Sequence, residues 1–156
     1  MAESIALSEF KEGIGFLKNG YANSALPHLR RAAETERSNP YYLSFLGLSV
    51  ARAERKFDEA VRLCETALSL KRNEIQLYLN LAEVYVACGR RVSAVDTLDR
   101  ALDTFGREAR LVKARSRVEV RRSPLLPFLR RTHFVNKGLG KLRHRALGLF
   151  QRQQYA

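Results

Sequence analysis

The residue types that carry out catalysis or bind metals are sparse in this sequence and lie far apart. The histidines are His28, His133 and His144, and none has the spacing to a second histidine, a cysteine or a carboxylate that a metal site needs. No serine or cysteine lies in a nucleophile motif, and the glycine-containing residues 138–141 are too few to cradle phosphates. We therefore expect no catalytic residue, no metal site, no cofactor and no enzymatic activity.

Basic residues are concentrated near the C-terminal end. The 156 residues include 28 Lys and Arg against 16 Asp and Glu, a formal net charge of +12 at pH 7. Residues 1–108 contain 15 of each kind, so the whole net charge falls in residues 109–156, where Glu119 is the one acid. This asymmetry predicts two functional parts and an anionic partner for the basic part. The alternative is a solvated basic surface that favours solubility.

Targeting signals and redox-active cysteines are not apparent. The first residues, MAESIALSEFKEG, contain neither a basic segment nor an apolar one, so we expect no secretory signal. No apolar run approaches the roughly 18 residues of a membrane span. Cys64 and Cys88 stand at apolar helical positions without a CxxC pair, which predicts reduced core cysteines. We expect a cytoplasmic protein, with a peripheral location at the inner face of the membrane as a further alternative.

A pair of alanines recurs three times along the chain at nearly constant spacing. The pairs are Ala25 and Ala32, Ala60 and Ala67, and Ala94 and Ala101. Apolar residues around them recur at the helical spacing i, i+3, i+4 and i+7. A period of about 34 residues indicates stacked helix-turn-helix units, which form extended binding surfaces rather than enclosed catalytic pockets.

Small residues and helix-ending residues divide each unit into two helices. The first helices contain Gly13, Gly47 and Ala82, where a neighbouring helix can approach closely. Gly20 and Gly89 lie at the expected turns between helices, where a left-handed residue can end a helix.

Two prolines and a last helical segment complete this division. Asn39-Pro40 marks the break between the first two units. Pro27 is expected in the first turn of a helix that Asn23 or Ser24 caps. Residues 107–120 predict a further helix that covers the exposed end of the third unit through Leu111, Ala114 and Val118.

The three units resemble the tetratricopeptide repeat family over about residues 6–108. The third unit is the most similar, with Tyr78, Leu81, Ala82, Tyr85, Gly89, Ala94, Leu98 and Ala101 on signature positions. The first departs most, because Glu9 and Glu12 stand where the family usually has an aromatic residue and a leucine. The resemblance implies an all-α, right-handed α-solenoid with repeats at about 6–39, 40–74 and 75–108. A capping helix completes a domain of residues 1–120, and residues 121–156 form a basic extension.

In this family the first helix of each repeat lines the ligand groove. Carried over position by position, the resemblance implies a partner-binding groove of Phe10, Ile14, Leu17, Lys18, Tyr41, Leu48, Arg52, Gln76, Leu79, Glu83 and Val86. This surface is largely apolar and suits an amphipathic helix. Chaperone-binding members hold a peptide's terminal carboxylate with a Lys and Asn clamp. Phe10 and Ile14 take the first two clamp places, which argues against that ligand. For some residues, including Leu17, the alternative is burial against neighbouring helices.

The basic extension contains two groups of cationic residues. Contacts with an anionic surface are expected from Arg121, Arg122, Arg130, Arg131, Lys137, Lys141, Arg143 and Arg145. After Asn136, the apolar spacing predicts a basic amphipathic helix. Such a helix can lie on an anionic membrane, contact nucleic-acid phosphates or fold back onto the groove.

These observations lead to one expected function and one alternative. We expect a protein–protein interaction adaptor that binds a peptide or helix of a partner in its concave groove and takes no small-molecule substrate. Its basic tail would serve for anchoring or assembly. The alternative is a nucleic-acid-associated factor that uses the basic extension to contact phosphates.

Overall fold

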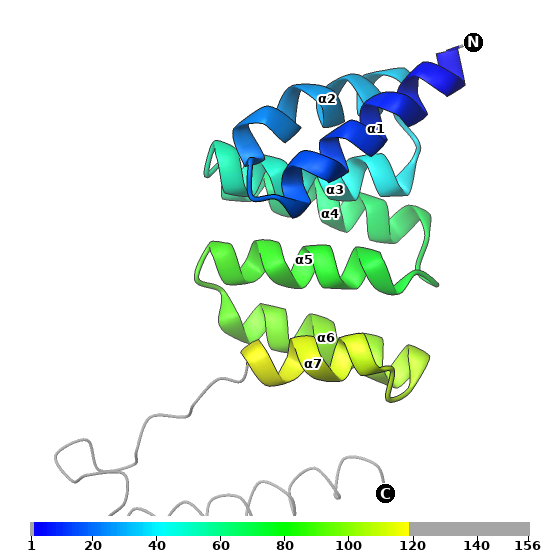
Figure 1. Ribbon diagram of the computed structural model, residues 1–156. Coiled ribbons are helices and arrows are strands. Elements are labelled where there is room, and N and C mark those ends of the chain that lie inside the picture. Colours follow the sequence, from blue (N-terminus) through cyan, green and yellow to red (C-terminus); the bar gives the residue numbers. More distant parts are fainter. Residues whose placement is uncertain (1, 119–156) are drawn as a thin grey trace, which may run out of the picture. The chain divides into compact units, whose positions relative to one another are not determined.

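Seven helices make up the part of the chain that the computed structural model describes, residues 2–118. They are α1 (Ala2–Lys18), α2 (Ala22–Thr35), α3 (Pro40–Ala53), α4 (Phe57–Leu70), α5 (Ile75–Ala87), α6 (Arg91–Phe105) and α7 (Ala109–Val118). These residues contain no strand, and all seven helices belong to one compact unit (Figure 1). None of these helices is long and apolar enough to cross a membrane. The predicted all-α fold is confirmed.

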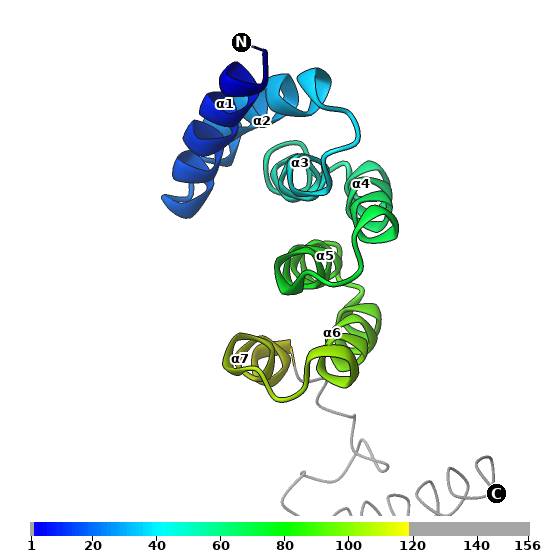
Figure 2. The ribbon, with the colours of Figure 1, turned by 90° about the vertical axis from the view of Figure 1, so that its right-hand side faces the viewer.

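The helices pack as consecutive pairs in two layers. α1 packs against α2, α3 against α4, and α5 against α6. The pairs stack because α2 contacts α3, and α5 contacts both α3 and α4. Figure 2 shows α3, α5 and α7 in one layer, which we call the inner layer, and α4 and α6 in the other, the outer layer. α7 packs on α6 and α5, so the prediction of three repeats and a capping helix is confirmed.

The recurring alanines lie where helices touch. All six alanines of the three pairs are completely buried. The small residues of the first helices serve the same purpose: a Cβ on Gly47 would lie 2.7 Å from Cys64 Sγ and 2.8 Å from the carbonyl oxygen of Ala60. Helices that pack this closely leave no room for a larger side chain. The period of small residues in the sequence is therefore the period of helix contacts in the fold.

Two of the three turns between paired helices depend on a glycine with positive φ. Gly20 has a φ of 84° and Gly89 a φ of 78°, a region that side chains other than glycine rarely adopt. After Gly20, the amide of Tyr21 donates to the carbonyl oxygen of Phe16 at 2.9 Å. This bond satisfies a free carbonyl group at the end of the first helix, and the glycine lets the chain reverse within a few residues.

The start of α2 differs from the prediction. The helix begins at Ala22, so Pro27 lies inside it rather than in its first turn, and neither Asn23 nor Ser24 is the cap. The turn closed by Tyr21 brings the chain directly into helical conformation, and the amide of Ala25 already bonds to the carbonyl oxygen of Tyr21 at 3.0 Å. Pro27 and Asn23 are both exposed, so water can reach the carbonyl group that the proline leaves without a donor.

By contrast, α3 begins where the sequence indicated. The side-chain oxygen of Asn39 accepts from the amides of Tyr41 and Tyr42 at 3.1 and 3.4 Å. Pro40 is the first residue of the helix, where a missing amide proton costs no hydrogen bond.

Candidate partner-binding groove

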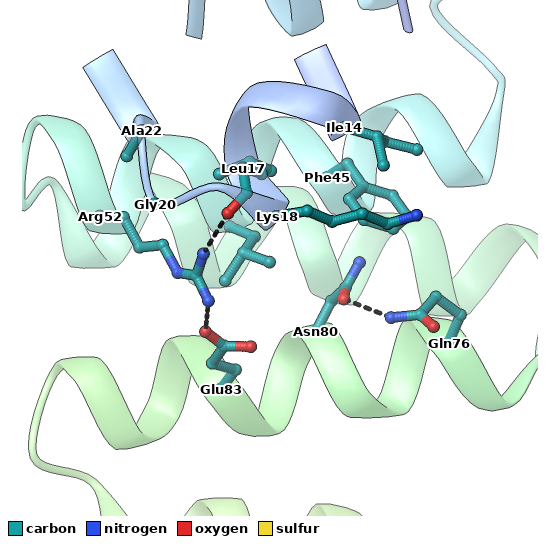
Figure 3. Close-up of a pocket in the computed structure, with 11 residues that line it drawn as sticks. Ile14, Leu17, Lys18, Gly20, Ala22, Phe45, Arg52, Gln76, Asn80 and Glu83 are labelled. Carbon is teal, nitrogen blue, oxygen red and sulfur yellow. Dashed lines mark hydrogen bonds and ion pairs between the residues drawn. The ribbon is translucent and has the colours of Figure 1, made fainter. Parts of the chain in front are cut away.

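A hollow of about 700 Å³ lies where the first helices of all three repeats meet (Figure 3). The end of α1, the turn after it, α3 from Phe45 to Arg52 and α5 from Gln76 to Glu83 surround it. The residues that line it are Ile14, Leu17, Lys18, Gly20, Ala22, Phe45, Leu48, Arg52, Gln76, Asn80 and Glu83. We call this feature the hollow.

The apolar part of the hollow is rigidly packed. Leu17 and Leu48 are only 5% and 4% exposed, so they form its floor and their other atoms belong to the core. Phe45 is half-buried, and its ring meets that of Phe10 edge to face with centroids 5.4 Å apart. Edge-to-face contacts of this kind fix the orientation of an aromatic side chain. The hollow therefore offers a preformed apolar surface, which requires little rearrangement to receive a side chain.

Arg52 of α3 forms the polar end of the hollow. Its Nη1 donates to the carbonyl oxygen of Leu17 at 3.3 Å, and its Nη2 forms an ion pair with the carboxylate of Glu83 (Figure 3). One guanidinium group thus joins α1, α3 and α5. Because the side chains of Arg52 and Glu83 remain 36% and 45% exposed, a ligand can reach both charges.

Asn80 of α5 lies beside this ion pair and is almost fully buried. Its Nδ2 donates to Ser44 Oγ at 3.0 Å, and its Oδ1 accepts from Gln76 Nε2 at 2.8 Å. Buried polar groups are tolerated when they are hydrogen-bonded in this way. The pair with Ser44 connects the second and third repeats, and it leaves the half-buried amide of Gln76 at the edge of the hollow.

Lys18 carries a further charge at the hollow. Its side chain is exposed, and among the described residues it has no ion-pair partner. Five polar side chains and five apolar ones, Ala22 included, line the hollow. The lining is therefore less apolar than the sequence predicted. The reason is that Gln76, Asn80 and Glu83 follow one another at helical spacing on the face of α5 that borders the hollow.

The structure brings together most of the predicted groove residues. Seven of them line the hollow: Ile14, Leu17, Lys18, Leu48, Arg52, Gln76 and Glu83. The lining residues absent from the prediction are Gly20, Ala22, Phe45 and Asn80. Asn80 stands four residues after Gln76, so the helical period alone could have identified it. Phe45 takes the corresponding position of the second repeat.

The other predicted groove residues lie away from the hollow. Phe10 packs under Tyr42, with ring centroids 4.6 Å apart, and so supports the groove rather than lining the hollow. Tyr41 lies near the turn before α5, where Lys71 Nζ sits 5.1 Å from its ring centroid. Burial, followed by a hydrogen bond with Glu74, raises the pKa of the Tyr41 phenol. Leu79 and Val86 are partly buried against the core.

Two expectations concern residues or sites beyond this groove. The eight basic residues predicted to contact an anionic surface, from Arg121 to Arg145, lie outside the described residues. Among the residues that are described, no group of three His, Cys, Asp or Glu side chains is placed to hold a metal ion.

Comparison with known proteins gives one family match, which covers part of the chain. A sequence model of the tetratricopeptide repeat family matches residues 51–118. Among curated proteins, none matches the chain significantly.

Solved structures of tetratricopeptide repeat domains have the same fold. The second such domain of human RPAP3, in complex with an HSP70 peptide, is 18% identical with a TM-score of 0.63, over 78% of this chain and 100% of that one. The Arabidopsis OM64 domain is 16% identical with a TM-score of 0.63, over 76% and 97% of the two chains. The TPR2B domain of yeast Sti1, in complex with an Hsp70 peptide, is 20% identical with a TM-score of 0.61, over 74% and 96%.

The family match and the structural likeness agree with the arrangement of the helices. The match begins within the second repeat and continues to the end of α7. The structural matches cover about the share of the chain that the seven helices occupy. Together with the three helix pairs and their buried alanines, these findings show that residues 2–118 have the fold of tetratricopeptide repeat domains and that residues 51–118 match the sequence model of that family.

Proposed function

We propose that this protein is an adaptor that binds a segment of a partner protein in the hollow and along the inner layer. The observation that carries the proposal is the position of the hollow, which spans the first helices of all three repeats and combines an apolar floor with accessible charges. Stacked repeats commonly bind partners on such a surface.

The lining indicates how a polypeptide would bind. An apolar side chain of the partner would contact Ile14 and Phe45, since these are the large apolar residues of the hollow that are only half-buried. The half-buried amide group of Gln76 can hydrogen-bond to a peptide main chain, and the exposed Lys18 can pair with a carboxylate. A helix or an extended segment satisfies these contacts, and the rigid floor keeps the entropic cost of binding low.

The structural relatives support peptide binding as a function that this fold carries out. The RPAP3 and Sti1 domains were solved with HSP70 peptides. We do not expect that ligand for this chain, because Phe10 and Ile14 take the first two positions of the family's carboxylate clamp. Phe10 is moreover held between Tyr42 and Phe45.

A paired substitution tests the proposal. Ile14→Asn changes the lining of the hollow, whereas Val92→Asn makes the same kind of change on the outer layer, where Val92 is 64% exposed. Proteins captured by the full-length wild type and by both variants would be compared quantitatively. The segment of each captured protein that binds would then be synthesised as a peptide, and its affinity for the three proteins would be measured. We expect Ile14→Asn to weaken a specific peptide while Val92→Asn leaves it unchanged. Equal peptide affinities for all three proteins, with unchanged helical content, would refute the proposal.

Contacts of the basic extension with a membrane or with nucleic acid, and the cytoplasmic location, remain predictions from the sequence. Liposome and oligonucleotide binding by the full chain and by a chain ending at Val120 would test the first of these.

A further inference from the structure

The capping helix α7 stands in the register of a first helix of a fourth repeat. α3, α5 and α7 begin at Pro40, Ile75 and Ala109, and this spacing repeats the period of the alanines. Leu111 takes the place in α7 that Leu77 has in α5, and both are completely buried. α7 is therefore a member of the inner layer, next to α5, as Figure 2 shows.

The contacts of α7 show which of its sides faces the core and which faces α6. Leu111, Ala114 and Val118 pack against the core. Arg115 marks the side that faces α6, because its Nε donates to Asp99 Oδ1 at 2.6 Å. The side opposite Arg115 must then face away from the outer layer.

That opposite side carries three cations. Arg110, Lys113 and Arg117 follow one another at helical spacing, and all three are exposed. In the repeat before, the equivalent positions belong to inner-layer residues of α5, namely Gln76, Leu79 and Glu83. We call these three cations the α7 stripe.

The stripe is available for an anionic ligand. Within the described residues, neither Lys113 nor Arg117 has an ion-pair partner, and Arg110 has only Glu108 of its own helix turn, at 3.7 Å. Lys18 and Arg52 at the hollow have the same sign, and Glu83 is the one acid among the residues of the hollow and the stripe. The hollow and the stripe together therefore have a net positive charge, although residues 1–108 as a whole are neutral.

We propose that the α7 stripe is a binding subsite for an acidic segment of the polypeptide that occupies the hollow. This inference rests on the proposed function and narrows the partner to a peptide with an apolar anchor next to Asp or Glu residues. The side chain of Leu79, half-buried on the same helix as Glu83, provides an apolar surface between the two subsites. Glu83 and the apolar floor interrupt the cations, so the surface fits a polypeptide better than the continuous phosphates of a nucleic acid.

The sequence predicts that the excess positive charge of residues 109–156 contacts an anionic surface, mainly through the basic extension. The structure shows that part of this charge lies on the repeat array instead. Residues 109–118 form α7 and contain four Arg and Lys and no acid. A basic region that the sequence treats as one block is thus divided between the inner layer and the residues beyond it.

The test compares two double charge reversals with the same net charge in the full chain. Lys113→Glu/Arg117→Glu alters the stripe, and Arg62→Glu/Arg91→Glu alters exposed residues of the outer-layer helices α4 and α6. The probes are a labelled peptide in which leucine is flanked by glutamates, the same peptide with lysines instead, and a single-stranded oligonucleotide of equal charge. Because the two variants keep the extension intact and have equal charge, long-range attraction to the extension is the same in both.

We expect the stripe variant to lower the affinity for the acidic peptide by about ten-fold and to weaken its salt dependence, since it replaces two attractive charges on the surface with two repulsive ones. The outer-layer variant should change it much less. Equal losses of peptide affinity in the two variants would overturn the inference. So would a stripe variant that loses more affinity for the oligonucleotide than for the acidic peptide.

Ile14→Asn changes the hollow without changing the net charge, and it therefore separates this inference from the proposed function. Weaker peptide binding with Ile14→Asn but not with the stripe variant would overturn the subsite and leave the hollow as the binding site. Weaker binding with the stripe variant alone would support the subsite and overturn the hollow.

Discussion

Arg52 of α3 and Leu17 of α1 are joined across a repeat boundary by a hydrogen bond of 3.3 Å from the guanidinium Nη1 to the main-chain carbonyl oxygen. Leu17 is the next-to-last residue of α1, and its carbonyl oxygen also accepts from the amide of Gly20 at 3.1 Å. The same guanidinium binds Glu83 of α5. One side chain therefore connects the end of the first helix to the third repeat.

Replacing Arg52 should loosen the first repeat. We expect Arg52→Ala to lower the free energy of unfolding by about 1 kcal/mol, a small effect because the ion pair is partly exposed. Hydrogen exchange of the amides near Gly20 should become faster. Arg52→Lys keeps the charge but cannot reach both partners with a planar group, so it should recover only part of the loss. Urea unfolding and hydrogen exchange would measure this, and full recovery with lysine would show that charge alone matters.

Two glycine substitutions should act in opposite directions. Gly47→Ala places a Cβ 2.7 Å from Cys64 Sγ and 2.8 Å from a main-chain oxygen, which we expect to cost about 1–3 kcal/mol through overpacking. Gly15→Ala meets no atom within 4 Å and should stabilise α1 by about 0.5–1 kcal/mol through its helix propensity. Thermal unfolding of the two variants gives the comparison. A gain of stability with Gly47→Ala would contradict the close contact of α3 and α4.

The buried pair of Ser44 and Asn80 should behave as a coupled unit. Asn80→Ala leaves the Ser44 hydroxyl without its partner, and an unsatisfied buried group costs about 1–3 kcal/mol. Ser44→Ala has the corresponding effect on Asn80. We expect the double variant to lose less than the sum of the single losses, because the second substitution removes the unpaired group. Additive losses in urea unfolding would show that the hydrogen bond contributes nothing.

Tyr85 should make the stability fall at alkaline pH. Burial, and then its hydrogen bond to Glu65 at 2.8 Å, raise the pKa of the Tyr85 phenol from 10.0 to about 12. A folded-state pKa above the unfolded value means that the stabilisation is complete below about pH 10 and is lost as the pH rises toward 12. Tyr85→Phe should therefore lose less stability than wild type over this range. Urea unfolding across the range would show it, and parallel losses in the two proteins would argue against the shift.

Several features of the fold could be predicted because they depend on local chemistry and on a repeating pattern. Gly20 and Gly89 end helices through their own backbone freedom, and Asn39 with Pro40 starts α3 through contacts within three residues. The start of α2 could not be predicted in this way. There, the turn closed by Tyr21 brings the chain into helical conformation before Asn23 or Ser24 can act as a cap.

The candidate groove was predictable only in part. The family resemblance indicated which side of each first helix faces the groove, and Ile14, Leu48 and Glu83 do lie together there. It could not show that Phe10 is held under Tyr42, because that depends on how closely α1 approaches α3. Nor could the sequence show that the guanidinium group of Arg52 contacts both Leu17 and Glu83, since these residues lie 35 and 31 positions away.

By itself, the sequence determined the number of repeats and the contacts made by the small residues, since only a small residue fits where two helices approach this closely. The tertiary structure decided which residues of the inner layer stay accessible and that the basic side of α7 belongs to the same layer. These properties depend on the angles between successive helix pairs, visible as the tilt of α1 and α2 in Figure 2. Those angles result from the packing of all the contacting side chains together, and no local pattern specifies them.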